Sequence, residues 1–532
     1  MNQVTKAAAV TERSLRTAAV IDIGTTSIRL AVAEIGQDGH VRKLETLAQA
    51  VSLGKDTFTG GTIARSTIEE CVRVLRSYRS ILEEYQIDSP SQIRVVATSA
   101  VREARNRLAF LDRVYIATGL EVEPLDEAEV NRITYLGIEP QLREDAALAS
   151  ARALVTEVGG GSTELLMVRG GDVVFAATYR LGSLRLRKTI ENLHAPTRRI
   201  RELMESHIQR VVHQIRKQVS NVLQGESVEL VALGGDVRWA ASRLVDDFSA
   251  DRLVRLPVEA LESLAGKITR LTDEEIVQRY HVPWPEAETL GAALLSYWHL
   301  AQAFQRPYLL VSSVNLRDGL LQEMAVQRHW SRDFSEQIIR SALDLGRRYS
   351  FDEPHARHVA ELSRTLFRQL RGLHKLSPRH EVILYVAALL HEIGQFVNVR
   401  SHHKHALYLI RNSELFGLSR QDLLLVALTA RYHRRSSPQP THAEYAALSR
   451  DDRVAVAAMA SLLRLAIALD ESRTQRVRDV ECVMEDNSLV IYVGGVENLA
   501  LEQLAMRQNS TLFEETFGMG VQVLPRREPA DN

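Results

Sequence analysis

The sequence predicts an α/β protein with two related lobes, followed by an all-helical domain and a small α+β domain. Two observations predict this fold class. A strand, a glycine-rich turn and two further strands begin at Ala18, and the same succession begins again at Ala153, which indicates two copies of one supersecondary unit. The composition then changes near Ser331, because residues 331–480 hold only 4 of the 28 glycines but 10 of the 17 histidines.

Length, charge and cysteine content exclude several classes of protein. The chain has 532 residues, too many for one hydrophobic core, and its 45% hydrophobic and 25% charged residues are typical of globular proteins. The formal net charge is -1, so we expect no nucleic-acid partner, and no apolar run predicts a membrane span. Cys71 and Cys482 are the only cysteines, which excludes a disulfide framework and favours a cytoplasmic location.

The first lobe is predicted over residues 17–139, after a loose, charged tail over residues 1–16. Apolar β-branched runs from Ala18 predict three successive strands, joined by short turns that contain glycine. Hydrophobic periodicity then predicts a helix over 63–85, a strand over 93–100, a helix over 102–119, a short strand over 120–125 and a polar helix over 126–136.

The second lobe is predicted over residues 140–328. Three strands again surround a glycine-rich turn, and a long helix over 198–223 and a strand over 228–235 follow. Two related α/β lobes in one chain imply a cleft between them. We therefore expect functional residues in the turns that would face this cleft.

The rest of the chain is predicted to be a helical domain over residues 329–480 and a small α+β domain over 481–532. Every segment of 331–480 has apolar residues at helical spacing. This stretch carries a net charge of +7 against -8 for the remainder of the chain. Strands over 481–495 and 521–525, around a helix over 499–517, predict the last domain.

Two turns between strands have the composition of phosphate-binding loops. Glycine removes the side chains that would keep an anion away from backbone N–H groups, and the hydroxyls of serine and threonine add further donors. One such turn is commonly an ordinary hairpin, but two of them could clamp a phosphate chain from both sides. Arg102 either neutralises phosphate charge or is a surface residue at a helix start. The candidate residues are Gly24, Thr25, Thr26, Ser27, Arg102, Gly159, Gly160, Gly161, Ser162 and Thr163.

Carboxylates accompany both turns. Hydrolysis of a phosphoanhydride needs a divalent cation on the phosphate oxygens and a base that orients water. Glu129, Glu157 and Glu164 are the candidate catalytic acids, and Asp22, Glu157 and Glu164 are the candidate ligands of Mg²⁺. Each one alone could be a solvated turn residue, but their position beside the two turns favours a functional role.

Seven collinear segments carry a resemblance to a known family. They are DIGTTSIRL, VVATSAVREARN, EVGGGSTELL, YRLGSLRL, ALGGDVRWAA, ETLGAALL and SSVNLRDGLL. In this order they resemble the exopolyphosphatase and guanosine pentaphosphate phosphohydrolase family, and VAALLHEIGQFVNVRSHHKHALYLIRNSELFGL and TARYHRR continue the resemblance. The collinear segments and the helical domain make a different function less favoured, that of a kinase or a chaperone built on the same two-lobed α/β core.

The resemblance implies two actin-like (ribonuclease H-like) lobes, Mg²⁺ as cofactor, a homodimer, and release of terminal phosphate from inorganic polyphosphate or guanosine pentaphosphate. It also implies a helical domain similar to the HD metal phosphohydrolases, which helps to bind long anionic chains.

Three positions depart from the family pattern. Val130 stands where the resemblance implies the acid that activates water, which leaves Glu129 as the neighbouring candidate. Glu157 replaces an aspartate, and Asp236 replaces a threonine in the loop implied to face a nucleotide, where an acid would disfavour a nucleotide phosphate. An alternative function is therefore a weakly active or inactive sensor that binds a phosphate polymer or an alarmone.

Histidines in the helical domain form a second candidate site. The residues His355, His391, Glu392 and Asp470 follow the order of the HD signature, with glutamate where aspartate is usual. Either they hold a metal ion, with further ligands from His402, His403, His405 and His433, or the domain is a scaffold that has lost the metal. Basic residues near these histidines form either a track for polyphosphate or a solvated face; they are Arg400, Lys404, Arg411, Arg431, Arg434 and Arg435.

Overall fold

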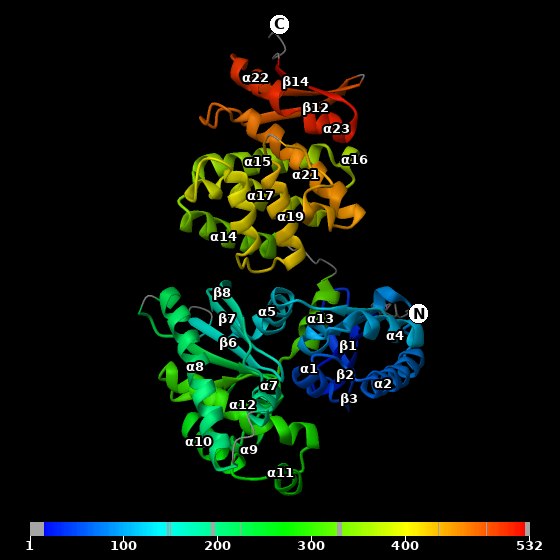
Figure 1. Cartoon of the computed structure of the whole chain (residues 1–532), viewed down its shortest axis with the longest axis vertical. Helices are drawn as coiled ribbons and strands as arrows, with labels where there is room; N and C mark the ends of the chain where they lie inside the picture. The colour runs from blue at the N-terminus through cyan, green and yellow to red at the C-terminus, as the bar shows by residue number, and fades with distance from the viewer. Residues whose placement is uncertain are drawn as a thin grey trace, which may run out of the picture. The chain divides into compact units, whose positions relative to one another are not determined.

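The structure is a computed structural model that describes residues 15–526, except 146–147, 149–150, 193–196, 224, 327–331, 435 and 486. The chain forms two compact units, which divide between positions 329 and 330 (Figure 1). Most of the predicted N-terminal tail and the last six residues lie outside the described part. Arg16, which the prediction placed in the tail, is the first residue of a strand.

The first lobe is built on a five-stranded sheet in the order β3-β2-β1-β4-β5. The first three strands are antiparallel, and β4 and β5 run parallel to β1. The strands are β1 (Arg16–Ile23), β2 (Ser27–Ile35), β3 (Val41–Ala50), β4 (Ile93–Ala97) and β5 (Val122–Pro124).

Helices cover both faces of this sheet, which explains why β1 is apolar at nearly every position. Ala19 and Ile21 belong to a core shared with the helices of one face, whereas Ala18 and Val20 belong to a core shared with α5 and α13 on the other. The helices are α1 (Leu53–Gly60), α2 (Arg65–Glu84), α3 (Ser99–Glu103) and α4 (Arg107–Thr118) on the first face, and α5 (Glu127–Glu144) and α13 (Leu316–Val326) on the second. The last helix lies within the range predicted for the second lobe, yet it packs on the first.

The second lobe repeats this topology in a six-stranded sheet, in the order β10-β11-β9-β6-β7-β8. The series β8-β7-β6-β9-β11 corresponds to β3-β2-β1-β4-β5, and β10 adds an antiparallel edge. The strands are β6 (Arg152–Val158), β7 (Thr163–Arg169), β8 (Asp172–Tyr179), β9 (Glu229–Leu233), β10 (Val254–Pro257) and β11 (Tyr308–Val311). The helices are α7 (Ser183–Glu191), α8 (Thr197–Leu223), α9 (Gly235–Leu244), α10 (Val258–Ile268), α11 (Asp273–Tyr280) and α12 (Trp284–Ala303). The predicted pair of related α/β lobes is thereby confirmed.

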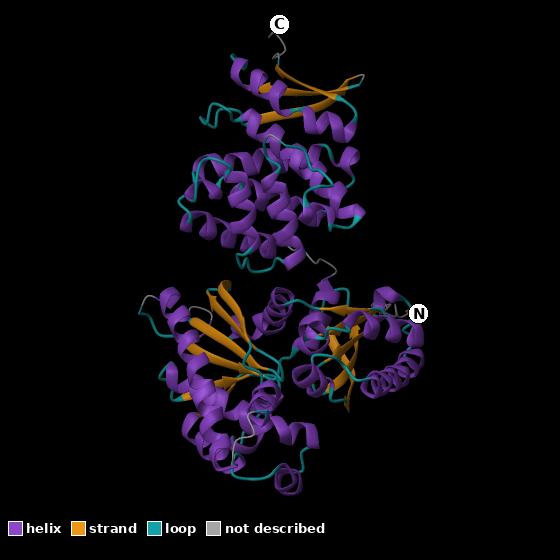
Figure 2. Ribbon diagram, in the orientation of Figure 1, coloured by secondary structure: helices purple, strands orange, loops and turns teal. Residues whose placement is uncertain are grey.

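The second unit is helical and ends in a small sheet (Figure 2). Its helices are α14 (Arg332–Arg348), α15 (Glu353–Gln369), α16 (Arg371–His374), α17 (Pro378–Leu390), α18 (His402–Arg411), α19 (Arg420–Arg431), α20 (Ala443–Ala446) and α21 (Arg450–Leu469). The α+β end consists of β12 (Asp479–Glu485), β13 (Ser488–Gly494), α22 (Ala500–Asn509), α23 (Thr511–Phe517) and β14 (Gly520–Pro525). None of the helices in the described part of the chain is both long and apolar enough to cross a membrane.

Candidate functional site between the two lobes

The two glycine-rich turns have the same backbone geometry. The N–H of Gly24 donates to the carbonyl of Ser27 over 2.9 Å, and the N–H of Gly159 donates to the carbonyl of Ser162 over 2.9 Å. Each turn joins the first two strands of its sheet, β1 to β2 and β6 to β7. The internal repeat therefore places one copy of the turn in each lobe.

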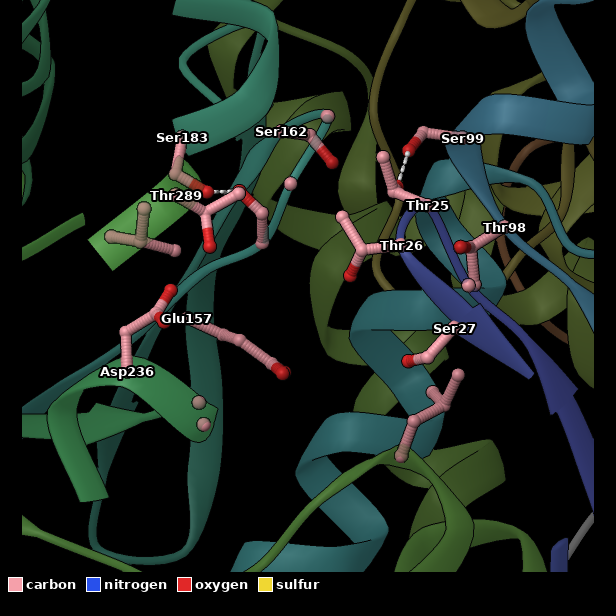
Figure 3. Close-up of a pocket in the computed structure, with 18 of the residues that line it drawn as sticks. Thr25, Thr26, Ser27, Thr98, Ser99, Glu157, Ser162, Ser183, Asp236 and Thr289 are labelled. Carbon is pink, nitrogen blue, oxygen red and sulfur yellow. Dashed lines mark hydrogen bonds between the residues drawn. The ribbon is translucent and has the colours of Figure 1, made fainter. Parts of the chain in front are cut away.

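A cavity of about 200 Å³ lies between these turns, and side chains from both lobes face it (Figure 3). Figure 3 shows Thr25, Thr26 and Ser27 on one side, and Glu157 and Ser162 on the other. Most predicted site residues line this cavity: Asp22, Gly24, Thr25, Thr26, Ser27, Arg102, Glu157, Gly159, Gly160, Gly161, Ser162 and Glu164.

The second turn needs glycine because it lies against the first lobe. A Cβ atom on Gly161 would lie 2.2 Å from Oγ of Ser99, and one on Gly160 would lie 2.9 Å from Thr25. Either side chain would push the turns apart and widen the cavity. The start of α7 approaches equally closely, since a Cβ on Gly182 would lie 2.2 Å from the carbonyl carbon of Gly161.

Neighbouring elements hold the second turn rigidly. The backbone N–H groups of Ser183 and Arg185, in α7, donate to the carbonyls of Gly159 and Gly160, each over 2.9 Å. The hydroxyl of Tyr297, in α12, accepts a 2.8 Å hydrogen bond from the N–H of Val158. Two carbonyls of the second turn thus accept hydrogen bonds from α7, while hydroxyl-bearing residues of both turns line the cavity.

Two glutamates, the half-buried Glu157 and the buried Glu164, face the cavity from neighbouring strands. Glu157 and Glu164 are directly opposite each other on β6 and β7. Burial raises the pKa of Glu157, and burial followed by the charge of Glu157 raises the pKa of Glu164 to about 7. Ser162 donates a 2.5 Å hydrogen bond to Oε1 of Glu164. Two adjacent carboxylates of this kind are suited to share a hard divalent cation, which would compensate their charge.

The equivalent positions in the first lobe carry opposite charges. Asp22 and Arg29 are opposite each other on β1 and β2, as Glu157 and Glu164 are in the second lobe. Asp22 also forms an ion pair with Arg317 over 3.3 Å. Asp22 is therefore compensated by a cation of this chain.

Arginines supply the positive charge of the cavity. Arg29 lines it, and no ion-pair partner for Arg29 is found within 4.0 Å among the described residues. Arg102 also lines it and donates a 2.8 Å hydrogen bond to the carbonyl of Leu125. Sequence reasoning did not single out Arg29 or Arg317, although both lie in segments that carry the family resemblance. The internal repeat could have identified Arg29, because Arg29 holds the position in the first lobe that Glu164 holds in the second.

Two predicted site residues point away from the cavity. Glu129 accepts hydrogen bonds of 2.9 and 2.6 Å from Arg132, which also pairs with Glu323 over 2.5 Å. This network holds Glu129 outside the cavity lining, so the expectation that it reaches the site is not met. The hydroxyl of Thr163 donates a hydrogen bond to the carbonyl of Leu181, so it does not face the cavity.

Val130 itself lines the cavity. Its side chain is 8% exposed and packs in the core between the first sheet and α13. An apolar side chain therefore stands where the family resemblance implies an acid. It offers no group that orients water.

The end of the cavity formed by the starts of α9 and α12 is acidic, and Asp236 lies beside Glu157 there (Figure 3). Asp236 lies in the first turn of α9, and Glu286 lies in the first turn of α12. Burial, and after it the charge of Glu286, raises the pKa of Asp236 to about 7. A phosphate group would meet electrostatic repulsion at this end above that pH.

The structure brings together the histidine candidates of the second unit. One nitrogen each of His355 and His391 and one oxygen of Glu392 lie within 4.8 Å of one another. Asp470 accepts a 2.7 Å hydrogen bond from Nδ1 of His355, and Glu392 pairs with Arg473 over 2.6 Å.

The basic residues near these histidines are partly compensated. Arg411 and Arg431 both lie 3.6 Å from the carboxylate of Glu444. Arg400 and Lys404 are exposed. Arg435 lies outside the described residues.

Comparisons with known proteins agree with this arrangement. A sequence model of the Ppx/GppA phosphatase family matches residues 17–328, and one of Ppx/GppA phosphatase, domain III, matches residues 339–509. The crystal structure of an exopolyphosphatase from Cytophaga hutchinsonii is 20% identical, with a TM-score of 0.53 over 59% of this chain and 98% of that chain, which shows a shared fold. The crystal structure of the Aquifex aeolicus member of the Ppx/GppA family is 24% identical, with a TM-score of 0.48 over 60% of this chain and 100% of that chain.

Proposed function

Because the chain belongs to the Ppx/GppA phosphatase family, we propose that it is a magnesium-dependent hydrolase that releases terminal phosphate from inorganic polyphosphate. Guanosine pentaphosphate is the second candidate substrate. The observation that carries the proposal is the adjacent pair Glu157 and Glu164, set between two turns whose hydroxyls face one cavity.

The residues present fit a magnesium ion. Glu157 and Glu164 are adjacent carboxylic acids, and the charge of Glu157 makes the more buried Glu164 harder to ionise. Mg²⁺ prefers carboxylate oxygens and would remove this penalty. When bound, the ion would polarise the terminal phosphate and neutralise developing charge.

The chain's own residues perform the remaining tasks. The turns at Gly24 and Gly159 hold phosphate oxygens with hydroxyls, and Arg29 and Arg102 compensate the charge of the polyanion. Burial and the charge of Glu157 raise the pKa of Glu164 to about 7 in the metal-free protein, and a bound cation would favour the ionised form of Glu164, which can accept a proton. We assign to Glu164 the role of orienting the attacking water, in place of Glu129.

Polyphosphate is the preferred substrate in this proposal because the cavity is acidic where the starts of α9 and α12 line it. Asp236 and Glu286 repel additional phosphate groups of a nucleotide bound across α9 and α12. A linear polyphosphate can instead leave the cavity along the basic side at Arg102.

Val130 favours a second candidate function, a weakly active or inactive sensor that binds polyphosphate or an alarmone. Without an acid at this position, the turns and arginines still bind phosphate, but water activation depends on Glu164 alone. Binding with little turnover is the signature of this alternative.

The deciding experiment measures phosphate release and binding on the same preparation. Long-chain polyphosphate and guanosine pentaphosphate are each offered with Mg²⁺ and with a chelator. Magnesium-dependent release supports the hydrolase, whereas calorimetric binding without release supports the sensor. Absence of both binding and release would reject both functions.

A further inference from the structure

Arg185 connects the two lobes next to the second glycine-rich turn. It lies in the first turn of α7, which packs against α1 where the lobes meet (Figure 1). Nη2 of Arg185 donates a 2.5 Å hydrogen bond to Oε1 of Glu103, the last residue of α3 in the first lobe. The guanidinium also lies over the ring of Phe58, in α1, with its central carbon 4.0 Å from the ring centroid. One side chain of the second lobe therefore contacts two helices of the first.

The same side chain holds the second turn. Nε of Arg185 donates a 2.6 Å hydrogen bond to the carbonyl of Gly161. The donors of a guanidinium have a fixed planar arrangement, so the Gly161 carbonyl and the Glu103 carboxylate are held in place relative to each other. Arg185 thus links the second turn to the first lobe.

The helices that Arg185 reaches also support the first turn. The backbone N–H of Gly54, in α1, donates to the carbonyl of Thr25 over 2.8 Å. The hydroxyl of Thr57, also in α1, donates to the carbonyl of Ala100, in α3, over 2.9 Å. The contacts of Arg185 therefore run from one glycine-rich turn to the helices behind the other.

The ion pair of Arg185 and Glu103 is largely enclosed. The two side chains are 13% and 28% exposed. Burial lowers the pKa of Arg185, and the charge of Glu103 opposes this effect. The other oxygen of Glu103 accepts a 2.8 Å hydrogen bond from Arg180, whose side chain is 75% exposed. Since loss of an enclosed partner costs more than loss of an exposed one, Arg185 contributes more than Arg180 to the connection between the lobes.

We propose that Arg185 is a positioning residue, which holds the two glycine-rich turns at the separation at which one phosphate chain contacts both. Arg185 itself does not line the cavity, so it acts through the Gly161 turn and through Glu103. The identity of the substrate rests on the proposed function, whereas the connection between the lobes rests on the contacts above.

This role predicts an effect on affinity. Without Arg185 the lobes spend part of the time apart, and the binding of substrate must bring them together. The apparent affinity then falls in proportion to the fraction of chains in which the turns are correctly spaced, while the reaction of bound substrate is unchanged.

The first measurement follows the separation of the lobes without substrate. Spin labels are attached to the full chain at Thr59→Cys in α1 and Thr189→Cys in α7, two exposed positions. Cys482→Ser removes the half-buried cysteine, and Cys71 is buried. We expect electron–electron resonance to give a narrow distance distribution for this parent chain. In Arg185→Lys it should be broader and extend to longer distances, because lysine keeps the charge but lacks the planar pair of donors.

The second measurement separates positioning from a contribution to folding. With long-chain polyphosphate and Mg²⁺, we expect Arg185→Lys to raise KM about tenfold, the equivalent of one charge-assisted hydrogen bond, with kcat within about twofold of the wild type. A purely structural defect would instead lower kcat with the folded fraction and leave KM unchanged. If the chain binds polyphosphate without turnover, the calorimetric Kd takes the place of KM.

Further variants test whether Arg185 and Glu103 act together. Glu103→Gln should have the same two effects, and the double variant should be no worse than the more affected single variant, because both changes remove one contact. Arg180→Lys is the matched control, because Arg180 binds the same carboxylate from an exposed position. It should keep the narrow distance distribution and the wild-type KM.

The proposal fails if Arg185→Lys keeps the narrow distance distribution, or if its KM equals that of the wild type. Glu103→Gln gives the same decision if Arg185→Lys does not fold. A parent chain that neither binds nor hydrolyses polyphosphate would reject the proposed function, and the distance measurement would still decide whether Arg185 connects the lobes.

Discussion

Val130 is the side chain whose replacement tests the chemistry most directly. It lines the cavity from α5 and is 8% exposed. In Val130→Glu, the new carboxylate would face the same space as Glu164. We expect phosphate release from polyphosphate to rise by about 10²-fold or more, because a positioned base contributes about 10²–10⁴-fold.

Val130→Gln is the control, because glutamine is as large as glutamate and polar but has no carboxylate that could act as a base. Both variants should lose stability, since an apolar core contact is replaced by a buried polar group. If Val130→Glu is folded and no faster than Val130→Gln, water is already activated by Glu164.

Glu164→Gln removes the proposed proton acceptor and keeps its shape. We expect magnesium-dependent phosphate release to fall at least about 10²-fold, with the unfolding midpoint unchanged or higher. Glu286→Gln is the matched control, because Glu286 lines the same cavity from the first turn of α12 and has no proposed role in polyphosphate hydrolysis. Wild-type turnover in Glu164→Gln would remove this residue from the mechanism.

The stability of the first unit should depend on pH through the same carboxylate. The pKa of Glu164 is about 7 in the folded chain and near the ordinary value of 4.5 when unfolded. Between these values only the folded state keeps the proton, so stability falls as pH rises from 4.5 to 7 and then levels off. The loss from this residue is up to about 3 kcal/mol.

Thermal unfolding in a chelator at pH 5 and pH 8 measures this loss. Glu164→Gln should be nearly as stable at pH 8 as at pH 5, apart from the similar effects of Glu157 and Asp236. Mg²⁺ should raise the midpoint of the wild type more at pH 8. An equal pH dependence in wild type and Glu164→Gln would contradict the burial of this charge.

The crossing of α5 and α13 determines where Val130 lies. A Cβ on Gly319 would lie 2.0 Å from the carbonyl oxygen of Ile133, so the two helices meet backbone to backbone. The buried ion pair of Arg132 with Glu323 joins the same two helices, and within α5 Arg132 also pairs with Glu129. The position of α5 is therefore set by packing as well as by charge.

Gly319→Ala should separate these helices. We expect a loss of about 1–3 kcal/mol in stability, as for other overpacked cores, together with a lower rate of phosphate release. Gly372→Ala is the control, because a Cβ there meets no atom within 4 Å. The idea fails if Gly319→Ala has the unfolding midpoint and activity of the wild type.

The elements that sequence reasoning predicted are those with local signals. Alternating apolar runs and glycine turns predict the repeated strands of both lobes. The predicted helix over 102–119 is in fact two helices, α3 and α4, because the side chain of Asn106 binds both the N–H and the carbonyl of Ile63, over 2.9 Å each. That partner is 43 residues away, so the local periodicity shows no break. The short strands β10 and β11 were also not predicted.

The same distinction applies to the candidate site. The turns and their carboxylates are contiguous in sequence and were predicted. The pairing of Arg317 with Asp22 joins positions 295 residues apart and depends on α13 returning to the first lobe. The side chain of Glu129 is held away from the cavity by Arg132, which also pairs with Glu323, and no sequence motif predicts this contact.

Charge is distributed unequally along the full chain. Residues 331–480 carry +7, and exposed Arg400 and Lys404 contribute to it. We predict that reversing both charges, Arg400→Glu with Lys404→Glu, weakens binding of long polyphosphate and makes its salt dependence shallower by about one or more in log–log slope. Short chains that fill only the cavity should bind as before.

Lys267→Glu with Arg270→Glu is the matched control, because these residues are exposed basic residues of the first unit. Calorimetry or filter binding at several salt concentrations measures both slopes. Equal slopes for the wild type and the Arg400→Glu, Lys404→Glu variant would show that the basic helices are only a solvated face.

The paired turns also bear on how such a site can arise and evolve. Gene duplication produces two equivalent halves, and here both halves keep the same hydrogen-bonded turn, whereas the second residue after it differs: arginine at position 29 and glutamate at position 164. This single exchange breaks the symmetry between the halves and gives the cleft a polarity. If polyphosphate is the substrate, as proposed, a linear molecule whose two ends are chemically alike would meet a site with a direction, with arginine at one wall and the glutamate pair at the other.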